Sequence, residues 1–279
     1  MKERLTVTID KDIINIVDHY VDGIKVKNRS HAIEVLLKEA LEDSIASKAL
    51  ILAGGRGTRL RPITREIPKP LIPVHGKTLL EHIFDLLKKY HIRNVILSIG
   101  YLGDKIKEFF GDGSKFGMKI QYIEENEPMG TAGPLRLARP FLKGNFIVCN
   151  ADELKDINVE DMMLFHKEHN AMATIALTTL SDTECFGVAE MQGDHILNFT
   201  EKPEPGTKRS NLVNAGFYIM NMSVIDMIPE GKSMLETDIF PKIAGRGKLI
   251  GYPFTGQWYA TDTHERYEYA LDNWKDIKG

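Results

Sequence analysis

Residues 53–62 read AGGRGTRLRP, directly after the apolar run 49–53, and residues 67–71 read IPKPL. A short apolar run bounded by glycines predicts a buried β-strand. Glycines at the C-terminal end of a strand let backbone amides approach phosphate oxygens, and neighbouring Arg and Lys side chains neutralise phosphate charge. The stretch therefore favours a nucleotide-binding loop on an α/β sheet, although a glycine-rich turn alone also fits an ordinary tight turn.

Two other phosphate-binding motifs are excluded by position. A dinucleotide-binding fingerprint that started at Gly55 would need Gly or Ala where Leu60 stands. A Walker loop that ended with GKT at residues 76–78 would need Gly at Leu71. The loop therefore belongs to a different class of phosphate site.

Outward from this loop, strand-like and helical patterns alternate along the chain. Apolar residues at helical spacing predict helices over residues 78–90 and 104–110. This alternation is typical of βαβ units, so residues 49–279 are predicted to form an α/β domain with a mainly parallel, Rossmann-like sheet and helices on both faces. The strands are predicted at residues 49–53, 94–99, 118–123, 146–150, 173–179, 196–201 and 213–220.

Residues 1–45 have a different character. The alternation of polar and apolar residues over 4–9 predicts a half-buried strand. Asp10 can cap a first helix that Gly23 ends, and Ser30 can cap a second helix. Single-chain cores below about 40 to 50 residues are marginal. We therefore expect this unit to form homodimers, and assembly into tetramers is left open.

The order of a strand RLTVTI, a helix, a Gly-containing turn and a helix opened by NRS resembles the ribbon-helix-helix family. In that family two strands pair into a ribbon that enters the DNA major groove, and the second helix holds a phosphate. Seven Lys and Arg against nine Asp and Glu over residues 1–45 is a low charge for DNA binding, so a dimerisation unit without DNA is the alternative. The DNA-contacting positions that the resemblance implies are Arg4, Thr6, Thr8, Arg29 and Ser30.

Composition excludes several other classes. A formal net charge of −3 over 279 residues gives no general attraction to nucleic acid or membranes. No apolar run approaches the ~18 to 20 residues that cross a bilayer, and the first ten residues lack a signal-peptide core. Cys149 and Cys185 have no metal-ligand spacing and cannot form a disulfide framework. We expect a soluble, cytoplasmic protein without membrane contact.

The string GGRGTRLRPITREIPKPLIPV, residues 54–74, closely resembles the signature of the sugar nucleotidyltransferases, or NDP-sugar pyrophosphorylases. The likeness extends through most of residues 49–279. It implies transfer of a nucleoside monophosphate from an NTP to a sugar 1-phosphate, with Arg59 holding the departing pyrophosphate and Lys69 bracing the phosphates. The positions implied around the triphosphate are Ala53, Gly54, Gly55, Gly57 and Thr58.

A reaction of this class needs no activated hydroxyl, because a sugar phosphate is already an anionic nucleophile. Positioning, a divalent metal and cationic side chains should carry the catalysis. Asp152 follows the strand predicted at 146–150, where α/β sheets place ligands, and Mg²⁺ prefers one or two carboxylates plus substrate phosphates. The resemblance makes Asp152 the first Mg²⁺ ligand and a catalytic residue.

The resemblance assigns the sugar phosphate to two further elements. The triplet EKP at residues 201–203 matches an element in which Glu201 accepts hydrogen bonds from sugar hydroxyls and Lys202 meets the sugar's phosphate. The triplet NAG at residues 214–216 matches an element that lines the sugar pocket, which implies roles for Asn214 and Gly216.

The C-terminal element departs from the family's pattern. Many relatives read W-x-D-x-G-T-P, with a metal-binding Asp, whereas residues 258–263 here read WYATDT and place Ala260 at the Asp position. Strand side chains alternate with period two, so Asp262 points the same way as position 260 if the segment is extended. We expect Asp262 to be the second metal ligand, and an altered or inactive site is the alternative.

The base-reading segment favours guanine. The run EPMGTAGPL, residues 127–135, looks most like mannose-1-phosphate guanylyltransferases and implies nucleotide contacts at Glu125 and Gly130. A carboxylate at Glu125 can accept from guanine's N1–H and its exocyclic amine together. Because of Ala260 and the N-terminal unit, the alternative is a DNA-binding regulator whose degenerate transferase domain senses a nucleotide sugar.

Overall fold

The computed structural model describes residues 6–44, 48–204, 206–207 and 209–277. The chain divides into two compact units, Met1–Ser44 and Ile45–Gly279. No helix in the described part of the chain is long and apolar enough to cross a membrane.

Two helices make up the described part of the N-terminal unit, α1 (Lys11–His19) and α2 (Arg29–Ser44). Asp10 caps α1 as predicted, because its side chain accepts a hydrogen bond of 2.8 Å from the Asp12 amide. The expected end of α1 at Gly23 is wrong, since the helix ends at His19. Gly23 lies in the following turn with φ +74°, where Asp22 accepts hydrogen bonds from three successive backbone amides.

The predicted cap of α2 is also corrected. The side chain of Asn28 accepts a hydrogen bond of 3.0 Å from the His31 amide, so Asn28 occupies the capping position and Ser30 lies inside the first turn. Residues 6–10 have no strand assignment. A ribbon strand would find its hydrogen-bond partner in another chain, and Arg4, at the start of the predicted strand, lies outside the described residues.

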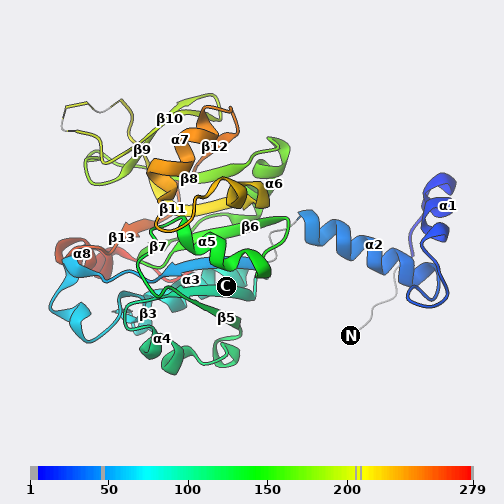
Figure 1. Ribbon diagram of the computed structural model, residues 1–279, viewed down its shortest axis with the longest axis horizontal. Coiled ribbons are helices and arrows are strands. Elements are labelled where there is room, and N and C mark those ends of the chain that lie inside the picture. The colour runs from blue at the N-terminus through cyan, green and yellow to red at the C-terminus, as the bar shows by residue number, and fades with distance from the viewer. Residues whose placement is uncertain (1–5, 45–47, 205, 208, 278–279) are drawn as a thin grey trace. The chain divides into compact units, whose positions relative to one another are not determined.

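The C-terminal unit is built on a nine-stranded sheet in the order β5-β4-β1-β6-β11-β8-β12-β10-β9 (Figure 1). The first four strands in this order are all parallel and lie close to their predicted positions. They are β5 (Lys119–Glu124), β4 (Asn94–Ile99), β1 (Lys48–Ala53) and β6 (Asn145–Asn150).

The other half of the sheet corrects the prediction of a mainly parallel sheet. Strand β11 runs antiparallel to both β6 and β8, and β10 runs antiparallel to β9 and β12, while β8 and β12 are parallel. The sheet is therefore mixed, because apolar runs predict strands but not the direction in which they pair. These strands are β8 (Ala173–Thr179), β9 (Gly187–Gln192), β10 (His195–Glu201), β11 (Leu212–Asn221) and β12 (Leu249–Pro253).

Helices cover both faces of the sheet, as predicted. One core joins alternate residues of β1, such as Ile51, to α3, α4 and α6, and the other joins Leu50 to α5 and α7. Helix α3 begins with a capping box, in which Thr78 and Glu81 bond each other's backbone amides. The helices are α3 (Leu79–Lys89), α4 (Gly103–Phe110), α5 (Gly133–Ala138), α6 (Val159–Glu168) and α7 (Phe240–Ala244).

A small two-stranded sheet brings the C-terminal segment to the end of β6. Strand β13 (Trp258–Ala260) pairs antiparallel with β7 (Glu153–Lys155), with Ala260 opposite Glu153. Helix α8 (His264–Asn273) follows and is anchored by buried Trp274, whose indole N–H lies 3.3 Å from the His82 ring nitrogen Nδ1. A hairpin of β2 (Pro73–Val74) and β3 (Lys77–Thr78) leads into α3.

Candidate active site

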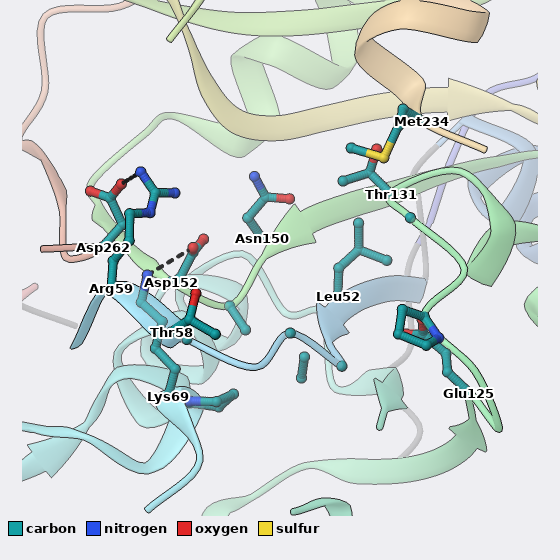
Figure 2. A pocket seen from close by; sticks show the side chains of 18 residues that line it. Leu52, Thr58, Arg59, Lys69, Glu125, Thr131, Asn150, Asp152, Met234 and Asp262 are labelled. Atoms are coloured by element: carbon teal, nitrogen blue, oxygen red, sulfur yellow. Dashed lines mark hydrogen bonds and ion pairs between the residues drawn. The ribbon is translucent and has the colours of Figure 1, made fainter. Parts of the chain in front are cut away.

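A cleft of about 380 Å³ opens where β1 and β6 end (Figure 2). Residues from both strand ends, the glycine loop, the segment after β5 and the C-terminal element line it. All of the predicted nucleotide, catalytic and metal positions therefore meet in one cavity. The predicted residues that line it are Ala53, Gly54, Gly55, Gly57, Thr58, Arg59, Lys69, Glu125, Gly130, Asp152 and Asp262.

The glycine loop needs glycine for two different reasons. Gly57 has φ +58°, and a Cβ there would lie 2.9 Å from the Thr64 methyl group. The Thr64 hydroxyl donates a hydrogen bond of 2.7 Å to the Gly57 carbonyl, which fixes the loop. At Gly54, a Cβ would lie 2.4 Å from a carboxylate oxygen of Glu125. Backbone approach, and not only turn formation, therefore explains these glycines.

Lys69 and Asp152 form an ion pair at one end of the cleft. The Lys69 ammonium lies 2.9 Å from Oδ2 of Asp152, and its side chain is only 8% exposed. Burial raises the pKa of Asp152, but the positive charges of Lys69, Lys155 and Arg59 together outweigh it and hold that pKa below its ordinary value. Asp152 is therefore an anion at neutral pH.

Asp262 lies at the same end of the cleft as Asp152 although the two are more than a hundred residues apart in the chain (Figure 2). Thr261 donates two hydrogen bonds to the Asp152 carbonyl, from its amide at 3.2 Å and from its hydroxyl at 2.9 Å. Oδ2 of Asp262 lies 2.6 Å from the Arg59 guanidinium. The backbone bridge at Thr261 thus brings a second carboxylate to the end of the cleft that holds Lys69.

The donor set at this end fits a divalent metal ion. Asp152 and Asp262 both line the cleft, and Mg²⁺ commonly uses one or two carboxylates together with substrate phosphates and water. Among the described residues no group of three His, Cys, Asp or Glu side chains is arranged to hold a metal. The remaining ligands of such an ion would accordingly come from the substrate and water.

Glu125 lies at the opposite end of the cleft (Figure 2). One carboxylate oxygen accepts a hydrogen bond of 2.8 Å from the Ser98 hydroxyl, and the other accepts one of 3.2 Å from the Met129 amide. Each carboxylate oxygen has a second lone pair, so the group can still accept hydrogen bonds from a bound base.

The residues predicted to bind the sugar phosphate do not line this cleft. Glu201 ends β10, and the Lys202 ammonium lies 3.5 Å from its carboxylate. Asn214 accepts a hydrogen bond of 3.0 Å from the Gly216 amide. Gly216 has φ +57°, and a Cβ there would lie 2.7 Å from the Asn150 amide nitrogen, which does line the cleft. Gly216 thus lies next to a residue that lines the cleft.

The sequence patterns did not indicate the ion pair between Lys155 and Glu153, which contacts Gly216. The Lys155 ammonium lies 2.9 Å from a carboxylate oxygen of Glu153 and donates to the Gly216 carbonyl, also at 2.9 Å. The Trp258 indole N–H donates to the same Glu153 oxygen at 3.2 Å. Burial raises the pKa of Glu153, and the charge of Asp152 adds to this. The alternation of the short strand β7 was the only signal available, and it does not reveal partners from β11 and β13.

A second missed contact supports the segment next to Gly130. The Thr131 hydroxyl lies 2.5 Å from a carboxylate oxygen of Glu236 and accepts a hydrogen bond from the Leu235 amide. Burial raises the pKa of Glu236. Gly130 itself has φ +75°, and a Cβ there would lie 2.3 Å from the Ser233 carbonyl. Contacts between segments a hundred residues apart leave no local pattern in the sequence.

Among the predicted DNA-contacting residues of the N-terminal unit, Arg29 is engaged in an ion pair within the unit. The Arg29 guanidinium makes a two-pronged ion pair with Asp18, with both N···O distances 2.7 Å. Thr6, Thr8 and Ser30 are exposed.

Residues 48–277 match a family model described as Nucleotidyl transferase. The chain is 40% identical over 217 residues to mannose-1-phosphate guanyltransferase beta-B of Xenopus laevis, a match that covers 76% of this chain and 60% of the relative. A mannose-1-phosphate guanylyltransferase catalytic subunit beta of Danio rerio is 39% identical over the same shares. The chain thus spans 60% of the length of these curated relatives.

Solved structures agree in fold. HddC from Yersinia pseudotuberculosis, in complex with GMP-PN, has a TM-score of 0.69 at 26% identity and covers 81% of this chain and 98% of its own. A UDP-glucose pyrophosphorylase complexed with UDP-glucose has a TM-score of 0.70 at 20% identity, over 81% and 97%.

Proposed function

The chain belongs to the nucleotidyl transferase family, and we propose on that basis that it transfers a nucleoside monophosphate from an NTP to a sugar 1-phosphate. The observation that carries this proposal is the single cleft that joins the glycine loop, Arg59, Lys69 and two aspartates. The relatives named as mannose-1-phosphate guanylyltransferases support the same reaction class.

The proposed reaction forms one bond and breaks one. A phosphate oxygen of the sugar 1-phosphate attacks the α-phosphorus of the NTP in line, and the bond from that phosphorus to the β-phosphate bridging oxygen breaks. Pyrophosphate leaves with the electron pair, so the products are an NDP-sugar and pyrophosphate. The obstacle is repulsion between two anions, which Lys69 and Arg59 reduce from positions that line the cleft.

We propose that the metal is Mg²⁺ and that Asp152 and Asp262 bind it. When bound, the ion would neutralise phosphate charge and help to orient the triphosphate. Lys69 and Arg59, which pair with these carboxylates in the structure, would then be free to contact phosphate oxygens. Both cations are thus placed to exchange a carboxylate partner for a phosphate partner.

A substrate matrix tests the proposal. Pyrophosphate release would be measured for each of the common NTPs against a panel of sugar 1-phosphates, with Mg²⁺ present and after chelation by EDTA. We expect turnover with at least one pair, highest with GTP, and its loss with EDTA. Absence of turnover with every pair would refute the enzyme proposal.

We propose guanine as the preferred base, read by Glu125. Support comes from the position of Glu125 on the cleft and from the guanine nucleotide analogue bound by the related HddC structure. A Glu125→Gln variant replaces an acceptor by a donor next to guanine's N1–H. We expect kcat/KM for GTP to fall by about 10² and the ratio of GTP to UTP use to fall similarly. Comparison of kcat/KM for both NTPs checks this, with Glu127→Gln as the matched control.

An unchanged GTP preference in Glu125→Gln would assign base recognition to backbone groups. A loss of thermal stability without a change in preference would give Glu125 a purely structural role, through its bonds to Ser98 and Met129.

We propose that the N-terminal unit is a ribbon-helix-helix module that dimerises with a second copy. Among residues 6–37, the part of the unit whose burial is described, only Val17 and Ala32 are buried. Its exposed large apolar side chains are Val7, Ile13, Ile16, Tyr20, Ile24 and Leu37. A second copy that covers these side chains would supply the core that the unit lacks. The pairing of Arg29 with Asp18 favours dimerisation over phosphate binding.

Charge introduced into this surface should break the dimer. Burial of one isoleucine contributes about 1.5–3 kcal/mol, and a dimer buries two copies. We expect Ile16→Glu to raise the dimer dissociation constant by at least about 10². Static light scattering across a dilution series of the full chain measures this change. Leu164→Glu, at a similarly exposed residue of α6, is the control.

If Ile16→Glu leaves the mass unchanged, the dimer forms elsewhere or not at all. Duplex DNA added to the same samples at low salt gives a separate result: a mass increase that Thr6→Ala abolishes would add DNA to the partners of this unit.

A further inference from the structure

We propose that Arg266, stacked on Phe186, is a positioning residue that holds Asp262 in the orientation needed for metal binding. This inference rests on the proposed transferase function. It identifies how this chain compensates for the Ala260 that stands at the usual aspartate position.

Two arginines hold Asp262, one on each carboxylate oxygen. Arg59 lies 2.6 Å from Oδ2, and Arg266 lies 3.0 Å from Oδ1. Arg59 is 57% exposed and lines the cleft, whereas Arg266 is 27% exposed and does not line it. Arg59 can therefore turn to a phosphate, while Arg266 keeps its hold on Asp262 from behind.

The Arg266 side chain is itself fixed by its surroundings. Its guanidinium carbon lies 4.5 Å from the centroid of the Phe186 ring, a cation–π arrangement. Phe186 in turn packs edge-on against Trp258 of β13, with ring centroids 5.4 Å apart. The Arg266 amide donates to the Thr263 hydroxyl that caps α8. Ring stacking and helix capping thus determine where the guanidinium lies.

The Asp262 side chain needs this constraint because it lies outside the paired part of β13. Strand β13 ends at Ala260, so Asp262 lies two residues beyond its last paired position. Thr261 ties the backbone to Asp152, but this contact leaves the Asp262 side chain free to rotate. Arg266, four residues further along and in the first turn of α8, supplies the constraint on the carboxylate.

Phe186 also joins this arrangement to the element predicted to meet the sugar's phosphate. The Lys202 amide donates a hydrogen bond of 3.0 Å to the Phe186 carbonyl. The same residue therefore supports the metal-binding carboxylate through its ring and Lys202 through its backbone. Displacement of the ring should disturb metal binding more than it disturbs Lys202, whose bond is to the main chain.

The test compares Arg266→Ala, Arg266→Lys and Phe186→Leu with the parent protein. Mn²⁺ binding in the presence of GTP would be followed by water-proton relaxation, and the Mg²⁺ dependence of turnover would be measured separately. Loss of a group that orients a metal ligand typically costs 10–100-fold in metal affinity. We expect about 10-fold weaker Mn²⁺ binding in Arg266→Ala and smaller losses in Arg266→Lys and Phe186→Leu.

Arg139→Ala is the matched control, because Arg139 makes a 2.6 Å ion pair with Asp226 away from the cleft. It should bind Mn²⁺ as the parent does, and thermal melts would show that all variants fold. If Arg266 only competed with the metal for Asp262, its removal would tighten Mn²⁺ binding, and either tighter or unchanged binding would overturn the proposal. Failure of the parent protein to release pyrophosphate would refute the function instead, because Mn²⁺ binding is measured without turnover.

Discussion

An Asp152→Asn variant is expected to lose about 10³-fold in kcat/KM for pyrophosphate release. The substitution keeps the size of the side chain and removes the charge that would hold the metal and that pairs with Lys69 at 2.9 Å. Removal of one preorganised electrostatic contact in a site of this kind costs about 10²–10³. Steady-state kinetics at several Mg²⁺ concentrations measure the effect, and excess metal should restore little of the activity.

Asp156→Asn is the control for this prediction. Asp156 follows β7 and makes a comparable ion pair with Lys89, 3.3 Å apart, outside the cleft. Its loss should change kcat/KM by less than about threefold, since exposed ion pairs contribute little. An Asp152→Asn protein that keeps a tenth or more of the parent activity would remove Asp152 from the metal site.

A Lys69→Met variant is expected to lose a similar factor, about 10³ in kcat/KM, for a different reason. Methionine retains the apolar stem of the buried lysine and removes the ammonium that would move from Asp152 to the phosphates. Because the pKa of Asp152 is held down mainly by Lys69 against burial, that pKa should rise in the variant. Activity that requires the ionised Asp152 carboxylate is lost as the pH falls through the folded-state pKa of that group, so the acid limb of activity should move to higher pH.

Lys89→Met serves as the matched control for Lys69→Met, and the double variant Asp152→Asn/Lys69→Met separates their roles. If the two residues act only through each other, the double variant should be no worse than either single variant. If each also contacts the substrate or metal, the losses should add. If the Lys69→Met protein has the kcat/KM of the parent, Lys69 has only a structural role.

Much of the first half of the fold could be predicted because its signals are local. The strand at residues 94–99 and the helix near 104–110 follow from apolar runs and helical spacing, and glycines mark the loop after β1. The direction of strand pairing in the second half could not be predicted, because β11 pairs with strands that are distant from it in the sequence. The capping residue of α2 could not be predicted, because Asn28 and Ser30 are both good capping residues and only geometry separates them.

The candidate site divides in the same way. Lys69 and Asp152 stand in motifs next to a glycine loop and a strand end, so their types and positions indicated a role. Arg266 and Glu236 carry no motif, and their importance comes from partners that the folded chain brings to them, Asp262 and Thr131. Such residues are identified by their position in the folded structure, which no local sequence pattern encodes.

The charges along the cleft have a consequence for selectivity among anions. Two cations, Arg59 and Lys69, and three carboxylates, Glu125, Asp152 and Asp262, line it, so the formal charge of the lining is negative. A bare phosphate or sulfate ion entering there meets arginine and lysine groups already occupied by aspartates. An anion that draws Lys69 away leaves Asp152 without that partner unless a divalent counterion arrives with it, whereas Asp262 keeps its contact with Arg266. The cleft should thus discriminate against the simple inorganic anions of the cell, and tolerate them at concentrations where an open basic pocket would be blocked.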